Sequence, residues 1–201
     1  MAAGDITAVL VTKVRTILDE DTAGLYSTTQ IYTALSDAQR EIAGHFLAMY
    51  KAKLMVNPSE QCPDVILPLL VSTTSATGTQ NLPTDYWDYL SITGGSSVNV
   101  RVRPMSRTLP HEITNTYLTS SSSQPYCYIN STQVVFETSV SWIMNYFKTL
   151  SDLSASVDPI LPVQTYNAMV QYAFANLLER DHDERAMQEF NKFVQMLQNI
   201  S

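Results

Sequence analysis

The hydrophobic period of this chain changes twice, and that change constrains the fold more than any other feature of the sequence. Near both ends, apolar residues recur every three or four positions, which is the spacing of one helix face. Between residues 59 and 157, short apolar runs alternate with Gly, Asn and Ser, which is typical of strands and turns. The sequence therefore predicts a mainly α fold with a β insertion: an antiparallel bundle of two N-terminal and two C-terminal helices, residues 1–58 and 158–201, carrying a small antiparallel sheet within residues 59–157.

Two helices are predicted in the N-terminal segment. Asp5 is expected to cap the first, and the acidic residues 19–21 to end it. Ser27 and Gln30 have the spacing of a capping box, which predicts the start of the second helix, and Asn57-Pro58 is expected to end it. The apolar face of the first helix comprises Ile6, Val9, Leu10, Val14, Ile17 and Leu18.

Two more helices are predicted after Pro162. The first carries an apolar face from Val163 to Leu177. Asp181 and Glu184 have the spacing of a second capping box, which predicts the start of the last helix.

The insertion contains six candidate strands. They are residues 65–71, 86–93, 98–102, 126–129, 133–136 and 142–147. Gly94-Gly95 and Asn130-Ser131 are predicted turns, and a short helix is predicted around residues 110–118.

The charge balance narrows the range of partners. Twelve Lys and Arg against nineteen Asp and Glu give a formal net charge of −7. This excludes a basic surface that grips nucleic-acid phosphates or anionic lipid. The longest apolar run, residues 65–71, is too short to span a bilayer, so no membrane partner is expected. Cys62 and Cys127 are predicted to be free thiols, with one disulfide between them as the alternative.

The sequence contains no motif of a catalytic or cofactor-binding site. There is no Gly-x-Ser-x-Gly nucleophile motif and no glycine-rich phosphate loop. Asp19, Asp21 and Gly24 match the first half of a calcium loop, but its last ligand position holds Gln30 in place of Glu. We therefore expect no cofactor and no metal, and the chain is predicted not to be an enzyme.

Two groups of side chains are candidates for contact with a partner. They are Arg101, Arg103 and Arg107, in an otherwise acidic chain, and Tyr86, Trp87 and Tyr89. Arginine, tyrosine and tryptophan are the residues that most often anchor protein interfaces. The alternative for the arginines is a solvated strand face, and the alternative for the aromatic residues is the core of the sheet.

Several segments, in the same order, resemble the head-to-tail adaptor proteins of tailed double-stranded DNA phages. Residues 29–43 resemble the N-D-A-Q-R-E-I-A helix of that family, with Ser36 where Asn is usual. Leu82-Pro83-Thr84-Asp85 resembles the L-P-x-D entry to its sheet. Residues 106–109, 124–129 and the final helix pair, residues 166–193, are similar as well.

The resemblance implies a virion structural protein of the head–tail neck, made in the cytoplasm of a bacterial host. Such adaptors form a twelvefold ring of identical subunits beneath the portal protein. A tail or nozzle protein attaches to this ring, and DNA passes through its lumen without sequence-specific binding.

Two other classes remain open from the sequence. One is another phage structural part, either a tail-completion or a capsid-decorating protein. The other is a cell-wall hydrolase, which requires paired carboxylates such as Glu112 and Glu137 to meet in a cleft.

Overall fold

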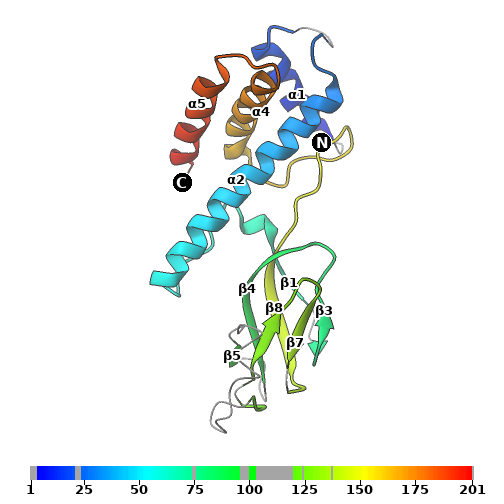
Figure 1. The fold of residues 1–201 in the computed structure, drawn as a ribbon, viewed down its shortest axis with the longest axis vertical. Helices are drawn as coiled ribbons and strands as arrows, with labels where there is room; N and C mark the ends of the chain where they lie inside the picture. Colours follow the sequence, from blue (N-terminus) through cyan, green and yellow to red (C-terminus); the bar gives the residue numbers. More distant parts are fainter. Residues whose placement is uncertain are drawn as a thin grey trace. The chain divides into compact units, whose positions relative to one another are not determined.

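The chain divides into two compact units, a helical unit and a sheet unit (Figure 1). The computed structural model describes residues 4–20, 24–73, 76–95, 100–102, 120–123, 125–136 and 138–200. The helical unit comprises Met1–Pro68 and Leu150–Ser201, and the sheet unit comprises Leu69–Thr149. The expected fold class, mainly α with a β insertion, is confirmed.

Four α-helices make up most of the described helical unit. They are α1 (Asp5–Ile17), α2 (Thr28–Val56), α4 (Tyr166–Arg180) and α5 (Ala186–Gln198). A 3-10 turn, Val163–Thr165, leads into α4. Helix α4 packs against each of the other three helices, and nine of its fifteen residues are buried. Figure 1 shows α4 between α5 and the pair formed by α1 and α2.

The N-terminus of α1 is capped from a distant part of the chain, so the expected cap at Asp5 is wrong. The N-cap is Gly4, with φ 90°, and Asp5 is the first helical residue. The Asp158 carboxylate instead accepts the backbone N–H groups of Gly4 (3.0 Å) and Thr7 (2.9 Å). A Cβ on Gly4 would lie 1.9 Å from the carbonyl oxygen of Ala155. Glycine is therefore required here both for its positive φ and for the close approach of the segment before Asp158.

Helix α2 begins and ends where the sequence predicts. The Ser27 hydroxyl accepts the Gln30 backbone N–H, and the Gln30 side chain accepts the Ser27 backbone N–H. Two buried polar residues of this helix hold the segment that returns to α4. Gln39 bonds the backbone of Ser151 and Ile160, and the Ser36 hydroxyl accepts the Leu153 N–H. Their burial is therefore compensated by hydrogen bonds.

The capping box predicted at Asp181 and Glu184 is wrong. Helix α5 has Arg185 as its N-cap, without a side-chain capping bond. The Asp181 carboxylate accepts a hydrogen bond from the hydroxyl of Tyr26, a buried residue that lies before α2 in the chain. Burial and the nearby Asp181 charge raise the pKa of Tyr26 well above its ordinary value. The Asp181 carboxylate therefore accepts a long-range hydrogen bond from Tyr26 instead of capping α5.

The described residues of the sheet unit form two antiparallel sheets rather than one. Its strands are β1 (Leu70–Ser72), β2 (Ala76–Thr77), β3 (Gln80–Asn81), β4 (Tyr86–Gly95), β5 (Val100–Val102), β6 (Cys127–Ile129), β7 (Gln133–Phe136) and β8 (Ser141–Lys148). The larger sheet has the order β1-β8-β4-β5, with β2 also paired to β8, and the smaller has the order β3-β7-β6. Both sheets contribute to one hydrophobic core, in which the rings of Phe136 and Trp142 stack with centroids 5.6 Å apart.

Five of the six candidate strands correspond to β4–β8, within a few residues at their ends. The sixth, residues 65–71, is wrong for most of its length. It forms a turn and the 3-10 helix Leu67–Leu69 before β1 begins. Pro68 lacks a backbone N–H and fixes φ near −65°, which disfavours a ladder position.

The turn predicted at Gly94-Gly95 is also wrong, because both glycines lie within β4. A Cβ on Gly94 would lie 2.9 Å from the Cβ of Trp142 on β8, so the glycine permits close pairing. The turn at Asn130 is confirmed: its side-chain oxygen accepts the backbone N–H groups of Thr132 and Gln133. The helix predicted around residues 110–118 lies outside the described residues.

Replacing Asp158 should loosen α1. The Thr7 backbone N–H, above all, lowers the pKa of the Asp158 carboxyl. A lowered pKa stabilises the fold at pH values above the unfolded-state value of about 3.9, and this contribution is lost as the pH falls through the folded-state value. We expect Asp158→Asn to lower Tm at pH 7, and the difference from wild type to narrow below about pH 3.9.

Thermal unfolding followed by circular dichroism at pH 7 and pH 3 measures this effect. Asp64→Asn is the matched control, because Asp64 is exposed and its carboxylate accepts none of the described hydrogen bonds. Equal Tm values for Asp158→Asn and wild type at pH 7 would contradict the capping role.

Candidate docking surfaces

The sequence places its candidate contact aromatics on β4, and the structure separates them into two kinds. Tyr86 and Tyr89 pack against the hydrophobic core of the sheet unit. The Tyr86 ring lies 6.0 Å from that of Tyr146, and Tyr89 is the register partner of Tyr146 on β8. Trp87 falls within the irregularity between Tyr86 and Asp88, is half-buried, and does not belong to that core cluster.

The hydroxyl groups of Tyr86 on β4 and Tyr146 on β8 remain protonated at neutral pH, because burial raises the pKa of both. Tyr146 donates a hydrogen bond of 2.9 Å to Asp85. Burial, with the neighbouring Asp88 carboxylate, raises the pKa of Tyr86 to about 12. These tyrosines can therefore act as hydrogen-bond donors at neutral pH.

The arginine group is described only in part. Arg101 lies in β5, where its backbone pairs with Thr93 of β4. The side chain of Arg101, together with Arg103 and Arg107, lies outside the described residues, as do Glu112 and Glu137. The contact role of Arg101, Arg103, Arg107, Tyr86, Trp87 and Tyr89 therefore stays a prediction.

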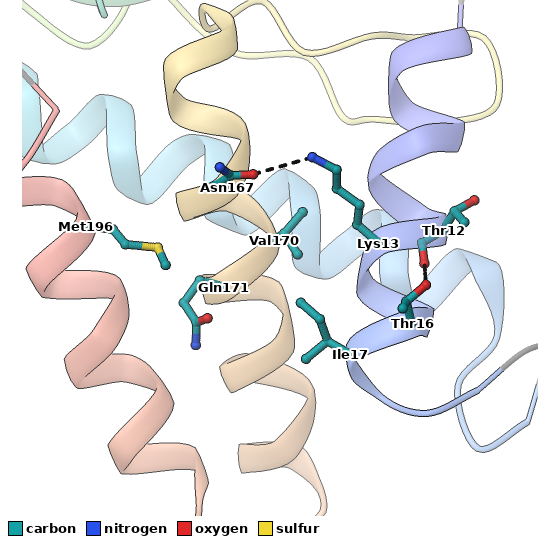
Figure 2. Close-up of a pocket in the computed structure, with 8 residues that line it drawn as sticks. All are labelled: Thr12, Lys13, Thr16, Ile17, Asn167, Val170, Gln171 and Met196. Atoms are coloured by element: carbon teal, nitrogen blue, oxygen red, sulfur yellow. Dashed lines mark hydrogen bonds between the residues drawn. The ribbon is translucent and has the colours of Figure 1, made fainter.

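The helical unit carries a groove that the sequence does not predict. Its volume is about 410 Å³, and it runs between α1 and α5 with α4 as its floor (Figure 2). It is lined by Thr12, Lys13, Thr16, Ile17, Asn167, Val170, Gln171 and Met196. Figure 2 shows Lys13 reaching from α1 towards Asn167, and their side-chain atoms are 3.4 Å apart.

One sign of this groove was present in the sequence. The apolar face assigned to α1 includes Val9 and Ile17, yet these side chains are 55% and 47% exposed. Helix α1 packs mainly against α4 and α2, so these two helices cover only part of its apolar face. Val9 and Ile17 therefore lie at the surface, and Ile17 forms part of the wall of the groove.

A second pocket, of about 460 Å³, lies between α2 and the segment that returns to α4. Arg40 is its cationic lining residue. The guanidinium of Arg40 is engaged by Asp37 at 3.1 Å and by Asp152. Because carboxylates of the chain already neutralise this cation, the pocket is a poor site for an anionic ligand.

The two cysteines are free, as the sequence predicts. Burial raises the pKa of Cys62 to about 11 and that of Cys127 to about 12. Both thiols are therefore neutral at physiological pH and weakly nucleophilic. Over the described ranges, no cluster of three or more His, Cys, Asp and Glu side chains could hold a metal ion. Nor does any helix in those ranges combine the length and apolar character needed to cross a membrane.

The half-buried aromatic residues of β4 and the groove of the helical unit define a protein with surfaces suited to macromolecular contact. A family model described as SU10 adaptor protein matches residues 7–201. The chain therefore belongs to the SU10 adaptor protein family, which confirms the resemblance to phage head-to-tail adaptors. Membership gives the chain a structural role as a phage adaptor, and the family implies a non-enzymatic protein of the virion neck. No curated protein matches the chain.

Because Tyr86 packs on the core and Trp87 does not, their substitution should lower the free energy of unfolding by different amounts. Tyr86→Ala removes a ring packed on the core and should lower the free energy of unfolding by about 2 kcal/mol, roughly half the cost of a fully buried aromatic. Trp87→Ala should cost less. Urea denaturation of both variants measures the difference, and a larger loss for Trp87→Ala would show that Trp87 also belongs to the core.

Proposed function

We propose that the protein is a head-to-tail adaptor that forms a ring between the portal and the tail of a phage and serves as a conduit for DNA. The observation that carries the proposal is the match to an adaptor family over residues 7–201. The order of the adaptor-like segments along the sequence is consistent with it. The proposed ring has twelve subunits, with the portal on one side and a tail or nozzle protein on the other.

The surface composition supports a ring subunit. Each subunit of a closed ring must present two different faces that recognise each other. Only 15% of the residues are charged, against about 25% in typical soluble domains. Surfaces of low charge lose less solvation energy when they are buried against a neighbour.

The net charge supports the role of a conduit. An acidic lumen repels DNA phosphates and lets the duplex pass without sticking. The formal charge of −7 is consistent with such a lumen. A lumen lined by Arg101 and Arg103 would argue against this part of the proposal. We assign these arginines, with Arg107 and the β4 aromatics, to contacts with the portal, the tail or a neighbouring subunit.

Negative-stain imaging of the protein mixed with the portal protein of the same genome tests the proposal. We expect a twelvefold collar at one end of the portal. The control is the portal alone, imaged at the same concentration.

A bare portal beside monomeric protein would contradict the adaptor role. Binding to a tail tube or to the capsid surface instead would favour a tail-completion or capsid-decorating protein. Cell-wall hydrolysis that is lost when Glu112 and Glu137 are both replaced would favour a hydrolase.

A further inference from the structure

The groove of the helical unit combines apolar walls with one cation, Lys13. Ile17, Val170 and Met196 supply apolar surface from three helices. Among the described residues, no carboxylate lies within salt-bridge distance of the Lys13 ammonium group, whose partner is the amide of Asn167. Six other cations of the unit have carboxylates within 4.0 Å: Arg15, Arg40, Lys53, Arg180, Arg185 and Lys192.

This charge pattern restricts what the groove can receive. Acidic residues outnumber basic ones in the chain, and Lys13 is the one cation among the residues that line the groove. An occupant that brings an apolar side chain and a carboxylate one helical turn apart would fill the groove and neutralise Lys13. Such complementarity contributes most to specificity and to the rate of association.

The outer face of α5, together with Glu184 in the turn that precedes the helix, supplies an apolar side chain and a carboxylate. We use the term outer face for Met187, Asn191 and Val194, which share one side of the helix at a spacing of four and three residues. Met187 is 69% exposed and Val194 is 49% exposed. Glu184 lies three residues before Met187, is exposed, and has no cation within salt-bridge distance in the described part of the chain. Methionine is flexible and fits irregular apolar grooves well.

The groove and the outer face lie on opposite sides of α5. Met187 and Met196 are nine residues apart, which is about two and a half turns of an α-helix. Met196 faces the groove in Figure 2, so Met187 lies half a turn away from it. A contact between groove and outer face is thus heterologous, since each copy uses one face for each neighbour. Contacts of this type close into rings when the rotation between subunits permits.

We propose that the groove between α1 and α5 receives the outer face of α5 from a second copy of this chain. Met187 of one copy packs against Ile17, and Glu184 pairs with Lys13. The charge complementarity of Lys13 and Glu184, on two surfaces of one chain, is the argument for a second copy as the occupant. The inference rests on the proposed ring and specifies which helices make its subunit contact.

Zero-length carbodiimide cross-linking of the wild-type protein tests this contact directly. The reagent joins an ammonium group to a carboxylate that touches it. Chains with natural nitrogen are mixed with ¹⁵N-labelled chains and assembled on the portal, so that mass spectrometry separates cross-links between copies from those within one. We expect a cross-link between Lys13 of one isotope and Glu184 of the other.

Rings without this cross-link would overturn the inference while leaving the adaptor role intact. A cross-link from Lys13 to a portal or tail carboxylate would also overturn it, because the groove would then hold a different occupant. If no ring forms on the portal in any condition, the proposed function fails, and the inference fails with it.

Charge reversal provides a second, independent measurement. Lys13→Glu and Glu184→Lys should each weaken self-association about fivefold, as expected for a surface ion pair of about 1 kcal/mol. The double variant should return to within about twofold of wild type, because the pair is restored in reverse. Met187→Asp should weaken association at least about tenfold, since it places a carboxylate against apolar walls.

Sedimentation velocity measures association, and circular dichroism verifies that each variant is folded. Glu179→Lys is the matched control: Glu179 is an exposed acid on α4 that belongs to neither surface. Loss of association in both single variants without recovery in the double variant would overturn the pairing of Lys13 with Glu184. Wild-type association of Met187→Asp would overturn the docking of α5.

Discussion

The helical unit depends on the burial of α4 among the other three helices. A helix surrounded on most sides must carry apolar or small residues over most of its surface, and α4 does so with three buried alanines and the larger Met169 and Phe174. Its buried amide, Gln171, donates to the carboxylate and the backbone carbonyl of Glu189 on α5. Since α1 and α2 precede the insertion and α4 follows it, the N-terminal helices complete their core only with C-terminal residues.

Because of this order of elements, the segment that returns to α4 must find hydrogen-bond partners for its backbone. Much of it lacks regular secondary structure, so its backbone polar groups need partners elsewhere. Side chains of α2 supply several of them: Gln39 bonds Ser151 and Ile160, and Ser36 accepts from Leu153. Asp158, within the same segment, satisfies the free N–H groups at the start of α1. The returning segment and the helices therefore complete each other's hydrogen bonding.

The same long-range bonds explain which features sequence reasoning could predict. The helices follow from their period and the five strands from their apolar runs, because both signals are local. The capping box at Ser27 and the turn at Asn130 were predictable because all their partners lie within three residues. Asp5 and Asp181 were misassigned because each case depends on a residue more than 150 positions away. Asp158 caps α1 in place of Asp5, and Tyr26 donates a hydrogen bond to the Asp181 carboxylate.

Candidate surfaces were harder to predict than the fold because apolar and aromatic residues serve cores as well as interfaces. On β4, Tyr86 and Tyr89 contribute to the core, which leaves Trp87 as the aromatic outside it. On α1 the apolar pattern extends beyond the core, since Val9 and Ile17 continue the apolar face but remain exposed.

A period of 3.6 residues shows how wide an apolar face is, but it does not show how much of that face a neighbouring helix covers. Helix α1 packs on α2 and α4, and helix α5 packs on α4, so each keeps apolar positions beyond the arc that its neighbours bury. In a subunit that acts through contacts, this uncovered remainder is where recognition can occur. Charged side chains beside this remainder, such as Lys13 on α1, can then add charge complementarity to apolar contact.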